Sequence, residues 1–315
     1  MTEFGRQTAD LFDYSRSNAV RVQAGLEITR PETEAALNEL VRRALTGGDA
    51  TAWMHGLFSC IAKMRHYSVF NANLIYLQRP GAAAVGTWRY WAAKERSIRP
   101  GAMPIIIFAP KGPYVLVYEY EDTEGREGGL ALPGPDHGPQ AVISPREWDG
   151  FRRRAEVFGR ETPDLPGIIH VIEEGLGTTR HGDVHYQRDA HDRFIVRINQ
   201  TLAPDKKWLT LVHELGHVFC GHMGHHPAGS WSDRRWLPGL GEQAVADVHE
   251  FEAEAVAWLL ATRAGIRAGS PDYLADRVRR MDAGLVDIAA ILTAANRIEP
   301  LTGARLNLRA AGAPL

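Results

Sequence analysis

Apolar residues recur at helical spacing over several stretches of the first half of the chain. Residues 31–45, 52–64, 67–77 and 87–95 have the period of amphipathic helices, and Gly or Pro follows most of them. Residues 103–109 and 114–120 are rich in β-branched and aromatic side chains and flank a Pro-Lys-Gly-Pro turn, which predicts a β-hairpin. Residues 1–30 show no clear period and are expected to form an N-terminal arm.

A stretch dense in Gly and Pro, residues 126–143, predicts a linker before a second domain. Ser144-Pro145-Arg146-Glu147 is a capping box for a helix that runs to about residue 158. Residues 168–172 and 194–198 are strand-like and bracket a polar segment. Helices then follow, and residues 301–315 form a tail. The pattern predicts an α+β protein with a helical and β-hairpin domain at 31–125 and a domain with a short sheet at 144–300.

Composition narrows the class of protein. The 315 residues are 44% hydrophobic and 23% charged, which supports buried cores and excludes collagen, coiled coil and wholesale disorder. No apolar run approaches the roughly 20 residues of a membrane helix, and the first residues lack a signal-peptide core, so we expect a cytoplasmic protein with no membrane partner. The two cysteines, Cys60 and Cys220, are far apart and predict reduced thiols rather than a disulfide scaffold.

Charge is uneven along the chain. Residues 61–111 hold eight Lys or Arg and one acid, Glu95, although the whole chain has a net charge of −2. Residues 61–111 and the rest of the chain are therefore expected to carry opposite net charges and to present opposite electrostatic fields. Aromatic residues are interleaved with these cations, which is typical of surfaces that bind single-stranded nucleic acid. A solvated basic face over an aromatic core is the alternative that composition alone leaves open.

The strongest chemical signal is His213-Glu214-Leu215-Gly216-His217, within a predicted helix over 205–220. Residues four apart share a helix face, so both imidazoles can hold one cation, and Zn²⁺ is the expected ion. Glu214 lies beside the open coordination position, where it can take a proton from water.

A third ligand is expected from the helix over 241–264. Glu252 falls in the middle of its apolar stripe, so this carboxylate is protonated, salt-bridged or a metal ligand, and we favour the ligand. His222 is expected at the helix end, and His225, His226 and His249 as solvated loop residues. The strand at 194–198 could hold an extended peptide along its edge.

At these residues the second half resembles the ImmA/IrrE family of metallopeptidases, whose signature is matched by HELGHVFCGH and EFEAEAVAWLL. The resemblance implies a zincin-like domain with His213, His217 and Glu252 as zinc ligands. The first half resembles the single-strand-DNA-binding domain of ArdC-like antirestriction proteins, over residues 67–110 and VYEYEDTEG at 117–125. Candidate DNA contacts are Tyr67, Asn71, Arg79, Trp88, Trp91, Arg96, Arg99 and Lys111.

Together these features predict a zinc-dependent metallopeptidase that binds single-stranded DNA and hydrolyses a protein or peptide substrate. The alternative is a non-proteolytic antirestriction protein that coats incoming single strands, with structural zinc. A third possibility couples the two, with bound DNA switching proteolysis on. An intact HExxH helix favours the enzyme, since a structural site has no use for Glu214.

Overall fold

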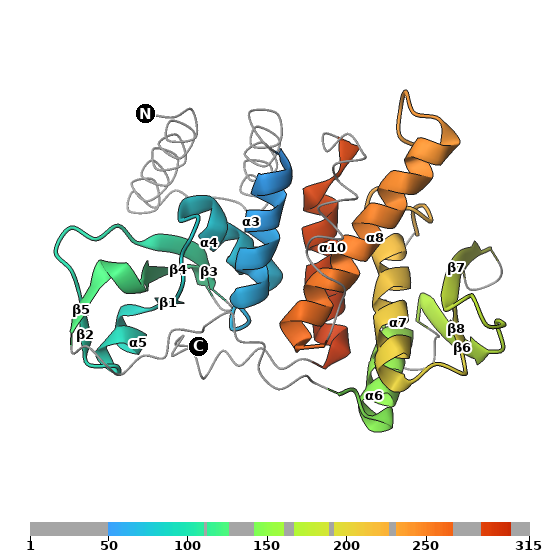
Figure 1. Cartoon of the computed structure of the whole chain (residues 1–315), viewed down its shortest axis with the longest axis horizontal. Coiled ribbons are helices and arrows are strands. Elements are labelled where there is room, and N and C mark those ends of the chain that lie inside the picture. Colours follow the sequence, from blue (N-terminus) through green and yellow to red (C-terminus); the bar gives the residue numbers. More distant parts are fainter. Residues whose placement is uncertain are drawn as a thin grey trace. The chain divides into compact units, whose positions relative to one another are not determined.

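The structure, a computed structural model of the chain, describes residues 50–109, 112–125, 142–160, 167–188, 192–226, 231–266 and 285–303. They fall into two compact units, one up to residue 125 and one from residue 142 (Figure 1). Both mix helices with small sheets, so the predicted α+β class is confirmed. The N-terminal arm, the helix predicted over 31–45, most of the linker and the tail after residue 303 lie outside the described residues. Among the described helices, none has the length and apolarity needed to cross a bilayer.

The first unit combines helices with a three-stranded antiparallel sheet and a two-stranded ribbon. In chain order its elements are α3 (Ala50–Lys63), α4 (Val69–Gln78), β1 (Val85–Gly86), α5 (Trp88–Ala92), β2 (Arg96–Ile98), β3 (Ile105–Ala109), β4 (Gly112–Glu119), η1 (Tyr120–Asp122) and β5 (Thr123–Gly125). The sheet has the order β1-β4-β3, and β2 pairs with β5. The predicted hairpin is therefore present as β3 and β4, with an irregularity between Ile107 and Ala109.

Two amide side chains of α4 close the outer edge of β3. Asn71 donates to the carbonyl of Phe108 and accepts from its N–H, both at 3.0 Å. Gln78 makes the same pair of bonds with Ile106, at 2.8 and 2.9 Å. Seven residues return to the same face of a helix, and alternate residues of an edge strand direct their backbone groups outward. The strand edge is thereby satisfied and joined to the helix.

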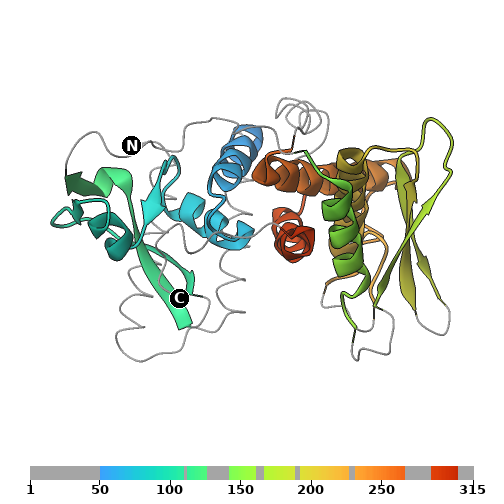
Figure 2. The same cartoon turned by 90° about the horizontal axis from the view of Figure 1, so that it is seen from below.

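The second unit places helices against one face of a three-stranded sheet (Figure 2). Its elements are α6 (Pro145–Glu156), β6 (Ile169–Glu174), β7 (Gly182–Gln187), β8 (Arg193–Asn199), α7 (Pro204–Phe219), α8 (Glu242–Ala264) and α10 (Ile288–Thr302). The capping box predicted at Ser144 and Glu147 opens α6. β8 is parallel to β6 and antiparallel to β7. It is paired on both sides, so the prediction that this strand offers an edge to a peptide is wrong. Within the described residues, the edges belong to β6 and β7.

Helix α7 is held in place by burial on nearly every side. It contacts β7 and β8 on one flank and α8 and α10 on the other. Gly216 permits the close approach of α8, because a Cβ there would lie 3.1 Å from the Cα of Ala253. Two helices this close can bring side chains of both to one small site.

Candidate metal centre

Two histidines one turn apart on α7 project toward the adjacent helix. Because residues four apart share a helix face, the rings of His213 and His217 lie together as the sequence predicts. Their Nε2 atoms are 3.2 Å apart. His217 is buried, whereas His213 is partly exposed. The pair therefore faces a site that solvent can reach from one side.

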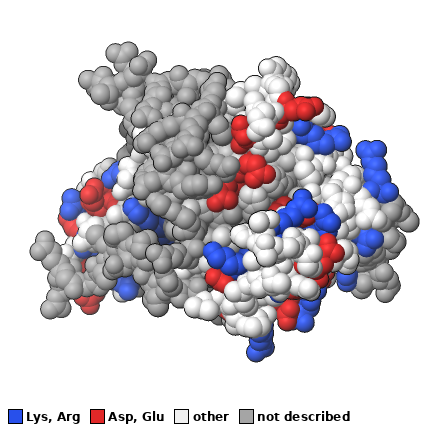
Figure 3. All heavy atoms as spheres, turned by 45° about the vertical axis from the view of Figure 1, so that its right-hand side comes forward, with Lys and Arg blue, Asp and Glu red and all other residues white. Residues whose placement is uncertain are grey.

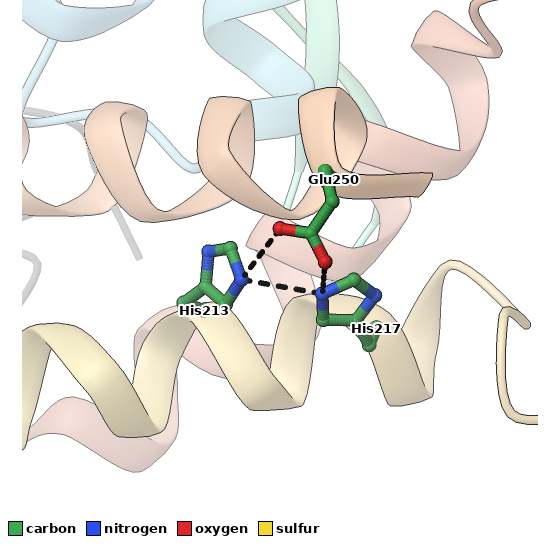
Figure 4. Close-up of side chains that lie close together, drawn as sticks. All are labelled: His213, His217 and Glu250. Carbon is green, nitrogen blue, oxygen red and sulfur yellow. Dashed lines mark hydrogen bonds and ion pairs between the residues drawn. The ribbon is translucent and has the colours of Figure 1, made fainter. Parts of the chain in front are cut away.

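Glu250 of α8 completes this group (Figure 4). Its Oε2 lies 3.6 Å from Nε2 of His213, and its Oε1 lies 3.4 Å from Nε2 of His217. Two ligands about 2.05 Å from a tetrahedral Zn²⁺ are themselves about 3.3 Å apart, so these three side chains fit around one cation. Two imidazoles and one carboxylate suit a divalent transition metal and leave a fourth position open.

Glu252, the third ligand expected from the sequence, is placed elsewhere. Its carboxylate forms an ion pair with both terminal nitrogens of Arg234, at 2.9 Å for Nη2. It also accepts a hydrogen bond from the backbone N–H of Asp287 at 2.8 Å. The side chain is fully buried, as expected, but Arg234 supplies the charge that a buried carboxylate requires. Glu252 is thus salt-bridged, and the structure brings Glu250 rather than Glu252 to the imidazoles.

The imidazole of His213 has a carboxylate at each ring nitrogen. Its Nδ1 lies 3.4 Å from Oε2 of Glu254, opposite the Nε2 that faces Glu250. Burial disfavours the charged ring, but the hydrogen bonds to Glu250 and Glu254 outweigh it and raise the pKa of His213 to about 10. The hydrogen bond from His213 is the main reason that the pKa of Glu250 lies well below its usual range. A divalent ion competes with the proton that these groups share, because metal ligands bind in their deprotonated forms.

Glu214 lies next to the three donors without joining them. Its angle on α7 turns it toward β7, where a Cβ on Gly182 would come within 3.4 Å of its Oε1. The side chain is 7% exposed, and burial raises its pKa to about 7. A carboxylate with a pKa near neutrality can both take up and release a proton, which is the requirement for a general base.

A further buried histidine follows the end of α7. Gly221, with φ of +85°, turns the chain after the helix, so His222 lies at the helix end as predicted. Its Nδ1 is 3.0 Å from Nδ1 of His217, and its ring stacks on His249 with centroids 4.0 Å apart. His226 and His249, expected as solvated loop residues, are instead buried and half-buried, and His249 belongs to α8.

Several residues expected to contact DNA have their side chains committed within the first unit. Trp91 has no exposed surface, and its indole N–H donates to the carbonyl of Tyr118 at 2.9 Å. Tyr67 is 5% exposed, and its hydroxyl donates to the carbonyl of Val85 at 2.8 Å. A base cannot stack on either ring unless the ring leaves the core. In this structure Trp91 and Tyr67, both predicted as DNA contacts, are core residues.

Asn71 and Arg96, also predicted as DNA contacts, likewise use their polar groups within the first unit. The amide of Asn71 is used at the edge of β3, as described above. Arg96 is buried, and its guanidinium donates to the hydroxyl and the carbonyl of Thr123 at 2.7 and 3.0 Å. It also lies over the ring of Tyr120, 4.1 Å from the centroid. Arg96 thus joins β2 to β5.

The remaining candidates differ in how far they are exposed. Trp88, at the start of α5, is 59% exposed, and the guanidinium carbon of Arg89 lies 5.4 Å from its ring. Arg99 is exposed after β2. Arg79 is half-buried and forms an ion pair with Asp122 at 2.9 Å. Lys111 lies outside the described residues. The structure therefore leaves Trp88 and Arg99 accessible to a ligand.

Charges on the sheet side of the second unit are mixed. Figure 3 shows acidic and basic side chains interspersed over this face. Arg197 of β8 pairs with Asp183 at 2.8 Å and with Glu174 at 3.5 Å, and Arg180 lies 3.3 Å from Asp183. The two arginines and two carboxylates of these ion pairs offset one another's charge.

Comparison with known protein families gives one match, within the second unit. Residues 168–233 match the IrrE N-terminal-like domain, Peptidase_M78. This stretch includes the HELGH motif and ends before Glu250. No curated protein matches the chain.

Two solved structures of the antirestriction protein ArdC from plasmid R388 are also similar. The metal-free form has a TM-score of 0.36 and 17% identity, with 79% of this chain and 87% of that one covered. The Mn(II)-bound form has a TM-score of 0.38 and 17% identity, with 81% and 98% covered. The match of residues 168–233 agrees with the ImmA/IrrE-type part of the resemblance drawn from the sequence.

Proposed function

We propose that the second unit is a metal-dependent peptidase. In this proposal His213, His217 and Glu250 hold a divalent ion, for which Zn²⁺ is the first candidate, and Glu214 is the general base. The observation that carries the proposal is the convergence of three donor atoms beside the buried carboxylate of Glu214. The match of residues 168–233 to a peptidase domain supports this reaction class.

The ion, when bound, supplies Lewis acidity that polarises the scissile carbonyl and lowers the pKa of the attacking water. Glu214 accepts a proton from that water at a carboxylate oxygen and passes it to the leaving amine. Glu254 holds Nδ1 of His213, so that Nε2 is turned toward the site. The outer edge of β7 runs beside Glu214 and offers main-chain groups to an extended peptide.

Replacement of the base tests this mechanism. The variant Glu214→Gln is expected to lower cleavage of a peptide library by about 10²-fold or more, since general base catalysis contributes that much. It is expected to keep one ion per chain, because Glu214 is not a ligand. Cleavage is followed by mass spectrometry and metal content by elemental analysis.

Two matched variants control the experiment. Glu250→Gln is expected to lose the ion as well as activity, whereas Glu242→Gln, an exposed site in the first turn of the same helix, is expected to lose neither. Undiminished cleavage by Glu214→Gln would rule out the mechanism.

A second function, the binding of single-stranded DNA, is proposed for the first unit. The exposed Trp88 with the guanidinium of Arg89 beside it favours this function, because a base can stack on the ring while the cation meets a phosphate. If the chain acts only by coating DNA, with a structural ion, then Glu214→Gln will protect transferred DNA as well as the unaltered protein does.

A further inference from the structure

Behind His217, polar groups form a continuous chain into the interior of the second unit. Nδ1 of His217 lies 3.0 Å from Nδ1 of His222, and Nε2 of His222 lies 2.9 Å from Oε2 of Glu252. The side chains of His222 and Glu252 have no exposed surface. Glu252 is in turn held by Arg234 and by the backbone N–H of Asp287. Glu252, at the inner end of this row of hydrogen-bonded groups, is thus fixed by contacts with the start of α10 and with the segment that carries Arg234.

The partners determine where each proton sits. Both carboxylate oxygens of Glu252 accept hydrogen bonds from the guanidinium of Arg234, so in its contact with His222 the carboxylate accepts and Nε2 of His222 donates. Arg234 already balances the charge of Glu252, and a second buried cation would have no partner, so His222 is neutral. Nδ1 of His222 is then an acceptor, and Nδ1 of His217 carries the proton.

This assignment leaves the other nitrogen of His217 unprotonated. Its Nε2 points its lone pair at the position shared with His213 and Glu250. Neutral imidazole with a lone pair on the binding nitrogen is the form that a metal ion requires, and a hydrogen bond at the opposite nitrogen fixes that form.

We propose that His222 is a positioning residue: held by Glu252, it keeps His217 as the Nδ1–H tautomer and aims Nε2 at the ion. This inference rests on the proposed function only in that the ion is bound by His213, His217 and Glu250. It assigns to the buried pair of His222 and Glu252 a role other than ligation.

The same residues do not form a second ion site. Cys220, His222 and Glu252 lie close enough to hold a cation. However, burial raises the pKa of the Cys220 thiol well above its usual value, and the guanidinium of Arg234 already occupies the carboxylate. A cation there would have to displace a buried arginine. Orientation of His217 is the role that the contacts support.

Nitrogen-15 NMR of the histidine rings in the full chain reads the proton positions directly. We expect the proton of His217 on Nδ1 and that of His222 on Nε2, both before and after Zn²⁺ is added. A proton on Nε2 of His217 in the zinc-free chain, or a doubly protonated His222, would overturn the proposal. This measurement needs no substitution at His222, so it decides the matter even if such variants do not fold.

Zinc affinity, measured by competition with a chelator, provides the second readout. His222→Phe is expected to weaken binding by about 10–100-fold, as is typical when a hydrogen-bond partner of a metal ligand is removed. His222→Gln is expected to recover most of the loss, since one amide both accepts and donates. His225→Gln, at an exposed histidine, serves as the control. Unchanged affinity in His222→Phe would contradict the proposal.

The outcomes separate this inference from the proposed function. Zinc binding with the expected tautomers but without hydrolysis would overturn only the peptidase. Failure of the unaltered chain to bind zinc would overturn both. Normal hydrolysis with unchanged zinc affinity in His222→Phe would overturn only the positioning role.

Discussion

The carboxylate of Glu252 is fully buried and forms an ion pair with Arg234. Its two oxygen atoms also contact the ring of His222 and the backbone N–H of Asp287. Removing one partner of such a pair leaves the other charge buried without compensation. We therefore expect Glu252→Ala to lower the free energy of unfolding by about 3–5 kcal/mol, measured by chemical denaturation.

A matched control lies one residue from Arg234. Asp233 and Arg235 form a solvent-exposed ion pair, so Asp233→Ala is expected to change the free energy of unfolding little. If Glu252→Ala kept full stability and lost only the metal ion, Glu252 would be a ligand and the structural role argued for it would be wrong.

Single residues also show what the period of apolar positions in a sequence cannot predict, namely the partner of a buried polar side chain. The apolar stripe of α8 identifies Glu252 as buried, and it is. The stripe cannot say whether the partner is an ion or an arginine 18 residues away in sequence. A ligand at an open site lies at the margin of the buried face, so Glu250, with its side chain 49% exposed, gives no burial signal. In the same way, composition cannot separate the exposed Trp88 from the buried Trp91.

At the scale of elements, the contact between α7 and α8 sets the geometry of the metal centre. A Cβ at Gly216 would meet the Cα, O and Cβ of Ala253 at 3.1, 3.3 and 3.4 Å. Gly216→Val adds three carbon atoms to this contact and is expected to separate the helices, which moves Glu250 away from the histidines. We expect thermal stability and zinc affinity to fall together.

Gly239→Ala offers a comparison, since nothing lies within 4 Å of a Cβ there, although its φ of +82° adds local strain. It is expected to affect stability but not zinc affinity. If Gly216→Val bound zinc normally, the helix approach would not be what positions Glu250.

Helices and the hairpin could be predicted from the sequence because their periods are strong, whereas β7 could not. Its sequence, GDVHYQ, alternates Val184 and Tyr186 with polar residues over only six positions. Its place in the sheet comes from pairing with β8. This is a tertiary contact, which the local strand propensity of six residues does not reveal. Local sequence therefore does not predict the strand that borders Glu214, and without that strand β8 is expected at an edge of the sheet.

For the whole molecule, the two proposed activities draw on different residues. The donors of the metal centre belong to α7 and α8, whereas the exposed tryptophan and its arginine belong to α5. Since none of these described residues is shared, we expect DNA binding and metal binding to be lost separately in the full-length chain. Trp88→Ala is expected to keep the bound ion, and Glu214→Gln to keep affinity for DNA.

The test on DNA uses a labelled single-stranded oligonucleotide and fluorescence anisotropy at several salt concentrations. Trp88→Ala is expected to weaken binding by about 1–3 kcal/mol, the contribution of one stacked base, and Arg99→Ala to reduce the salt dependence.

Trp91→Ala should instead destabilise the fold by about 3–5 kcal/mol, because it empties a core position. Binding by Trp88→Ala that equals the unaltered protein at every salt concentration would mean that the exposed ring does not contact DNA, and the nucleic-acid function would then lose the observation that favours it.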